Sequence, residues 1–180
     1  VDRGDYWDVA GPVRPGERLR DLAARHLEGL PDATRAALLA IALGEPIGLD
    51  VAHRVAATRE LADLERRGLV AVDDGPPATV VTTVPALADV VRDDAGPLQR
   101  RMVLEGVVEA AGDGYDGGLD PVRLAAWTLE LGRTPGPELV ARAAPLALGR
   151  FDLATAEALA DRMPPTTVAS VVLGLSLIHI

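Results

Sequence analysis

The chain of 180 residues contains no cysteine and no lysine. Without cysteine it forms no disulfide, no thiolate zinc site and no cysteine nucleophile. Without lysine it cannot hold the phosphate-binding loop GxxxxGK[ST], whose lysine reaches the nucleotide phosphates. These two absences remove several classes of catalytic and nucleotide-binding site from the stretch covered by the sequence.

Aromatic residues make up only 3% of the chain, although hydrophobic residues make up 48%. The core must therefore consist of leucine, valine and alanine, which suits closely packed helices better than a β-sandwich. The formal net charge is −9. Because affinity for nucleic acid comes mainly from clustered positive charge, this balance argues against DNA or RNA binding by this stretch.

The sequence also lacks the patterns of a membrane protein or an enzyme. It has no run of 18 apolar residues and no signal peptide, so we expect no membrane contact and a cytoplasmic location. GxGxxG, HExxH, GxSxG and EF-hand patterns are absent. We therefore expect no catalytic residue, bound metal or cofactor in this stretch.

Both ends of the sequence indicate a fragment. The chain begins at Val1 rather than at methionine, within the segment VDRGDYWDVAGPV. Residues 175–180 read LSLIHI, which matches a translation of the transposon adapter used in sequencing libraries. We expect these six residues to be an adapter artefact and the protein to continue beyond Gly174. The alternative is an ordinary hydrophobic helix end.

The first half of the chain predicts three helices followed by a β-hairpin, after a first helix over residues 17–30. Pro31 breaks that helix, Asp32 is the expected N-cap of the next, and residues 45–48 are an expected loop. Gly44 and Gly68 are expected helix ends. The predicted helices span residues 33–43, 49–56 and 58–67, and the strands span residues 69–72 and 79–83. This order is typical of a winged helix; a three-helix bundle with a stray hairpin is the alternative.

The second half predicts only helices, over residues 85–92, 97–111, 121–131, 136–148 and 152–162. The segment Gly149–Leu159, GRFDLATAEAL, resembles the turn of a tetratricopeptide-type repeat, where small residues follow an aromatic one. The Gly/Asp-rich loop over residues 112–120 is the expected domain boundary. The predicted fold is mainly α: a lead-in at 1–30, a winged-helix-like domain at 31–95 and a TPR-like domain at 96–174.

Arg59, Arg66 and Arg67 are the candidate interaction residues, because they lie on the helix that would recognise DNA in a winged helix. Residues 31–95 hold 6 arginines against 11 acidic residues, and the turn DDGPPA between the strands is acidic. A helix that enters the major groove should present net positive charge. The pattern favours contact with protein over contact with DNA.

A structural role explains the other polar residues better than a catalytic or metal-binding role does. His26 and His53 lie on separate predicted helices and have no recognisable catalytic partner. The paired acids Asp73–Asp74 and Asp93–Asp94 lie at expected turns and helix ends. The aspartates of the Gly/Asp-rich loop are Asp113, Asp116 and Asp120. This loop lacks the closing glutamate of a calcium-binding loop, so we interpret it as a solvated linker.

The segments GPVRPGERLRDLAARHLEGLPDATRAALLAIALGEPIGLDV, LADLERRGLVAVDD, RLAAWTLELG and ARAAPLALGRFDLATAEALA occur in that order. In this they resemble the middle of large LuxR-family regulators of the MalT-like STAND ATPase class, over residues 11–174. The resemblance implies an ATPase domain before Val1 and a DNA-binding helix-turn-helix after Gly174. ATP would then be a cofactor of the whole protein and not of this fragment.

The resemblance implies a non-catalytic coupling and sensor segment of an ATP-dependent transcription regulator. Its expected partners are its own ATPase domain and an inducer or protein bound on the helical repeats. DNA would be contacted only through the C-terminal helix-turn-helix. Two alternatives remain open, a stand-alone winged-helix DNA-binding regulator and a structural helical scaffold.

Overall fold

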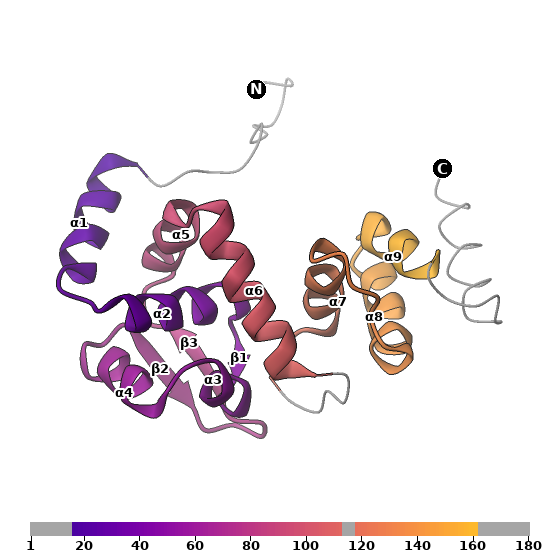
Figure 1. The fold of residues 1–180 in the computed structure, drawn as a ribbon, viewed down its shortest axis with the longest axis horizontal. Coiled ribbons are helices and arrows are strands. Elements are labelled where there is room, and N and C mark those ends of the chain that lie inside the picture. Colours follow the sequence, from indigo (N-terminus) through magenta and orange to yellow (C-terminus); the bar gives the residue numbers. More distant parts are fainter. Residues whose placement is uncertain (1–15, 113–117, 162–180) are drawn as a thin grey trace, which may run out of the picture.

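The computed structural model describes residues 16–112 and 118–161. Expectations for the lead-in before Gly16, for Asp113, Asp116 and Arg162, and for the segment LSLIHI lie outside these residues. The described part is mainly helical with one small sheet (Figure 1). Its helices are α1 Glu17–Leu27, α2 Asp32–Gly44, α3 Leu49–Val55, α4 Thr58–Arg66, α5 Pro85–Asp94, α6 Pro97–Ala111, α7 Pro121–Glu130, α8 Pro137–Gly149 and α9 Leu153–Ala160. Its strands are β1 Ile47–Gly48, β2 Val70–Asp73 and β3 Thr79–Thr82.

Helix α2 forms the centre of the core. Every residue from Ala37 to Gly44 is buried, so this helix is apolar on all sides over its last two turns. Helices buried all round pack against several neighbours. Here α2 contacts α3, α4, α5 and α6 as well as strand β3. The run of alanine and leucine that predicted a helix therefore also places it in the middle of the fold.

The sheet has three antiparallel strands in the order β1-β3-β2. Strands β2 and β3 form the hairpin that the sequence predicted, and their register pairs Val70 with Thr82 and Asp73 with Thr79. The expectation of a loop over residues 45–48 was wrong, because Ile47 and Gly48 form β1 and pair with β3. A strand of two residues is too short to carry an alternating pattern, so only its partner reveals it.

The start of α2 differs from the expectation that Asp32 is its N-cap. Pro31 holds the extended N-cap conformation, with φ −58° and ψ 151°, and Asp32 is already the first helical residue with no side-chain capping bond. Its carboxylate still lies near the positive end of the helix dipole. Side-chain capping occurs instead at α7 and α9, where Asp120 and Asp152 accept hydrogen bonds from backbone amides of the first turn.

Helix α6 leads from the part that contains the sheet to the part formed by α7, α8 and α9 (Figure 1). In that second part, α8 packs against both α7 and α9. The helices meet through small side chains, since Ala143, Ala147 and Ala156 are completely buried. Phe151 lies in the α8–α9 turn with a left-handed φ of 58° and is 75% exposed.

The end of the Gly/Asp-rich loop is packed rather than solvated. Gly118 has a left-handed φ of 90° and lies directly against the backbone of Gly48 in β1. Leu119 is 3% exposed and packs beside Gly44 at the end of α2. The connection between the two parts is thus held by the core, although a division of the chain at this loop stays a prediction.

Candidate functional site

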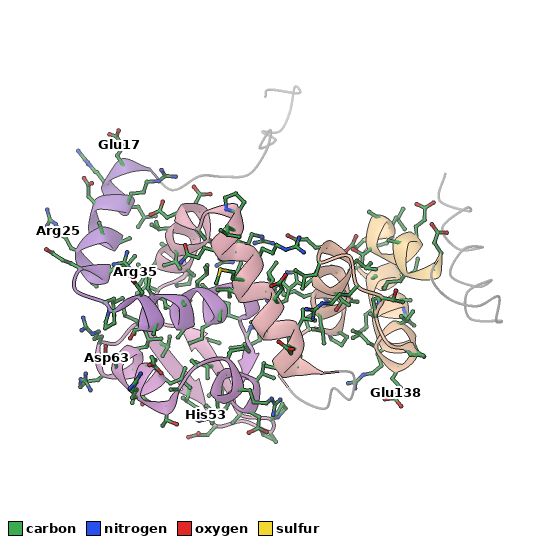
Figure 2. The ribbon with its side chains drawn as sticks, in the orientation of Figure 1. Glu17, Arg25, Arg35, His53, Asp63 and Glu138 are labelled. Carbon is green, nitrogen blue, oxygen red and sulfur yellow. The ribbon has the colours of Figure 1, made fainter. Side chains whose placement is uncertain are left out.

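The three candidate arginines, two in α4 and one at its C-cap, pair with acidic residues of that helix. The Arg59 Nε donates to Glu60 Oε1 at 2.8 Å. The Arg67 Nε donates to Asp63 Oδ2 at 3.1 Å, and Arg66 donates to the other oxygen of Asp63. Asp63 lies on the side of α4 away from α7, α8 and α9 (Figure 2). The structure therefore brings Arg66 and Arg67 together at one carboxylate and leaves Arg59 with a different one.

These pairs keep the helix electrostatically balanced. The hydrogen bond from Arg59 lowers the pKa of Glu60 below its ordinary value, while burial of the carboxylate acts in the opposite direction. The same bond raises the pKa of Arg59. Water screens ion pairs whose guanidinium is exposed, so these pairs add little to the stability of the fold. Their main effect is on the charge that the helix presents at the surface. Each guanidinium already has a neighbouring anion, so little positive charge is left unbalanced.

The two histidines stay apart, as their separation in sequence predicted. His26 is exposed on α1, and its Nδ1 lies 2.8 Å from the carbonyl oxygen of Leu22 in the preceding turn. His53 is exposed on α3, at a separate place on the surface (Figure 2). Over residues 16–112 and 118–161, no group of three or more histidine, aspartate or glutamate side chains has the geometry to hold a metal ion.

The paired acidic residues, Asp73–Asp74 and Asp93–Asp94, include side chains that make structural contacts in a turn and at a helix end. Asp73 Oδ1 accepts from the Gly75 amide at 3.1 Å, which fixes the hairpin turn. Asp93 Oδ2 accepts from Arg20 at 2.6 Å and so joins the end of α5 to α1. Both contacts agree with the interpretation of these acids as turn and helix-end residues.

Asp120 is the aspartate of the Gly/Asp-rich loop that lies within the described residues. One carboxylate oxygen accepts from the Val122 amide at 2.8 Å, and the other pairs with Arg150 at the end of α8. Burial acts to raise the pKa of Asp120, but the bond from Arg150 and the amides of Val122 and Arg123 outweigh it and lower the pKa. This carboxylate caps α7 and ties it to α8.

A cluster of polar contacts surrounds the side chain of Glu45, just after α2. Glu45 Oε2 accepts from the Thr82 amide at 2.9 Å and from the Thr82 hydroxyl at 2.5 Å. Glu45 Oε1 accepts from the Arg92 Nη2 at 3.1 Å. The Glu45 side chain is only 20% exposed. One carboxylate thus holds the end of α2 to strand β3 and to helix α5.

The backbone of the same residue joins α7 to this cluster. The Arg123 Nη1 donates to the carbonyl oxygen of Glu45 at 2.8 Å and to that of Leu43 at 3.3 Å. Leu43 lies in the last turn of α2 and Glu45 directly follows the helix, so no intrahelical donor remains for these two carbonyls. We call Glu45, Thr82, Arg92 and Arg123 the Glu45 junction. It joins α2, the sheet, α5 and α7 at one place.

The sequence did not indicate the Glu45 junction. Glu45 was assigned to a loop, and its partners received no role. They lie 37, 47 and 78 residues away from it in sequence, so no local pattern connects them. No protein-family model matches the chain, and comparison with curated proteins and with solved structures finds no match either.

Proposed function

We propose that this chain is the non-catalytic coupling and sensor segment of an ATP-dependent, LuxR-type transcription regulator. In this proposal residues 31–95 form a winged-helix-like domain, and the helices from α6 onward begin a TPR-like array. The Glu45 junction is the observation that carries the proposal. It fixes the helical part on the sheet-containing part through charged hydrogen bonds, as transmission of a signal between them requires.

The element order supports a winged-helix-like domain. Helices α2, α3 and α4 precede the hairpin of β2 and β3. Strand β1 adds a third strand beside β3 and anchors the hairpin to the core. The closely packed alanines of α8 and α9 support the TPR-like assignment, because small residues let successive helices of a repeat approach each other.

The pairing within α4 supports contact with protein rather than with DNA. Arg59 pairs with Glu60, and Arg66 and Arg67 both pair with Asp63. Phosphate binding releases counterions only where positive charge is not already neutralised. The exposed turn residues Asp73 and Asp74 would also repel a DNA backbone. The proposed partner of this surface is the ATPase domain of the same protein.

The remaining partners follow from the same proposal. ATP would bind the ATPase domain, DNA would bind a C-terminal helix-turn-helix, and an inducer or protein would bind the helical array. None of the helices in the described ranges has the length and apolar character that crossing a bilayer requires. A ligand of the array would act by binding one arrangement of the parts more tightly than another.

Two measurements test the proposal. The genomic flanks of the reading frame should encode a P-loop upstream and a helix-turn-helix downstream; a short frame without either would contradict it and favour the structural scaffold. The chain itself should show no saturable binding of a fluorescent ATP analogue. It should also give no salt-dependent mobility shift of duplex DNA at low ionic strength, and such a shift would favour the stand-alone DNA-binding regulator.

A further inference from the structure

Helix α6 carries two exposed apolar side chains that lie one turn apart. Leu98 is 72% exposed and Met102 is 64% exposed. The next residue at the same spacing is Gly106, where an added Cβ would meet no atom within 4 Å. Residues spaced by four lie on one face of a helix. This face of α6 therefore presents two projecting side chains followed by an unfilled position.

The unfilled position borders a groove of about 420 Å³ between α2, α4 and α6. Met102 and Gly106 line the side formed by α6, and small side chains, among them Ala36 and Ala40 of α2, line the other side. A cavity of about 150 Å³ already accommodates benzene, so this groove has room for a leucine side chain. The face of α6 thus combines a projecting leucine with an opening that can receive one.

The charges beside this row of residues are of opposite sign. Arg101 and Glu105 are neighbours on α6, and the Arg101 Nε donates to Glu105 Oε1 at 3.1 Å. A surface that binds a second copy of itself about a two-fold axis must be complementary to itself. The face of α6 meets this requirement, because it holds a projecting side chain and an opening, and a positive and a negative charge.

We propose that two copies of this chain associate through α6 in antiparallel orientation, with the two-fold axis at Met102. Leu98 of each copy then lies opposite Gly106 of the other and enters its groove, as a knob enters a hole between packed helices. Met102 packs against its counterpart, and Arg101 of each copy lies near Glu105 of the other. The association does not rest on the regulatory function proposed above.

A second copy suits this face better than a small ligand does. An apolar molecule in the groove would leave Leu98 and Met102 in water, whereas a second α6 covers both of them and fills the groove. The contact consists of one helix and one groove on each copy, so it is small. Small contacts are weak, and we expect a dissociation constant on the order of 10–100 μM.

Sedimentation equilibrium of the full chain from about 1 μM to about 1 mM should show a monomer–dimer equilibrium. Leu98→Asp should weaken the association by about a hundredfold or more, because each dimer loses two buried leucines. Leu22→Asp is the matched control, since Leu22 is a leucine of α1 that is 51% exposed, and it should leave the association unchanged. A chain that stays monomeric at about 1 mM would overturn the proposal.

Single cysteines test the register, because the chain has none of its own. Met102→Cys lies on the two-fold axis and should form a disulfide with its counterpart, since the Cα atoms of linked cysteines lie within about 7 Å. Leu98→Cys alone should not, because its two copies would lie about 12 Å apart along the helix axis. A mixture of Leu98→Cys and Gly106→Cys should form the mixed disulfide. Efficient linkage of Leu98→Cys to itself would mean a parallel contact and would overturn the proposal.

Charge reversal provides an independent test. Arg101→Glu and Glu105→Arg each place like charges opposite one another in the dimer and should weaken self-association about tenfold. A mixture of the two variants restores opposite charges at both facing positions and should associate at least as tightly as the unaltered chain. A mixture that associates no better than either variant alone would contradict the antiparallel contact. This comparison still decides if Leu98→Asp fails to fold, as judged by circular dichroism.

Discussion

Gly118 and Gly48 are in backbone contact: a Cβ on Gly118 would lie 2.1 Å from the Gly48 Cα. The contact seats the start of the α7–α9 part on strand β1. Gly118 also has a φ of 90°, a conformation that other residues adopt only with strain. Gly118→Ala should therefore lower the free energy of unfolding by about 2–4 kcal/mol, the sum of overpacking and backbone strain. Urea denaturation followed by circular dichroism measures this loss, and a loss below 1 kcal/mol would contradict the contact.

Gly106→Ala is the matched control and should have the opposite effect. Gly106 lies inside α6, and a Cβ there meets nothing within 4 Å. Alanine is the better helix former, so the substitution should raise the free energy of unfolding by about 0.5–1 kcal/mol. The same urea titration measures it. A destabilised Gly106→Ala variant would contradict the open space beside Gly106.

The carboxylate of Glu45 should be one of the largest polar contributors to stability. Glu45→Ala leaves the buried Thr82 amide without its side-chain acceptor and removes one of the acceptors of Arg92, which keeps Asp89. Loss of a charged acceptor from a partly buried cluster costs about 2–3 kcal/mol. Thermal unfolding should detect it, whereas Glu138→Ala, at an exposed position of α8 (Figure 2), should change stability by less than about 0.5 kcal/mol. Equal effects of the two substitutions would show that the cluster contributes little.

Local features of the sequence predicted most of the elements. α4 is an example, because Leu61 and Leu64 face inward at helical spacing and Gly68 ends the segment with a φ of 68°. The hairpin was predicted for similar reasons, since apolar runs flank a turn rich in glycine and proline. Such signals lie within a few residues of one another and do not depend on the rest of the chain.

The features that the sequence did not predict depend on contacts between distant segments. Strand β1 exists only because Ile47 pairs with Val80. The burial of Glu60 likewise follows from how α2 packs beside α4, since the other acidic residues of α4, Asp63 and Glu65, are less buried. The arginines of α4 were located correctly, but their neutralisation depends on side-chain geometry. Sequence patterns therefore predicted the helix but not the ion pairs on its surface.

Arg123 should hold α7 on the end of α2. Arg123→Ala removes its bonds to the carbonyl oxygens of Leu43 and Glu45. We expect a loss of about 1.5–3 kcal/mol, the usual contribution of a charged hydrogen bond to a buried acceptor. Hydrogen exchange of α7 amides should accelerate more than that of α4 amides, because the contact lies at α7. Arg133→Ala, which removes an exposed arginine after α7, is the control; a uniform acceleration in Arg123→Ala would contradict a local tether.

Asp120 should make stability depend on pH in the acidic range. Its pKa in the folded chain is lower than its ordinary value, so the folded state binds the proton less readily than the unfolded state does. The resulting stabilisation is fully present above the unfolded pKa of about 4 and is lost as the pH falls through the folded pKa. Asp120→Asn keeps a capping side chain but loses the ion pair with Arg150. At pH 7 it should therefore be less stable than the unaltered chain by about 0.5–1 kcal/mol. Thermal unfolding of both proteins between pH 7 and pH 3 measures the difference, which should stay constant down to about pH 5 and then narrow; a difference that widens toward pH 3 would mean that Asp120 is stabilised in its protonated form.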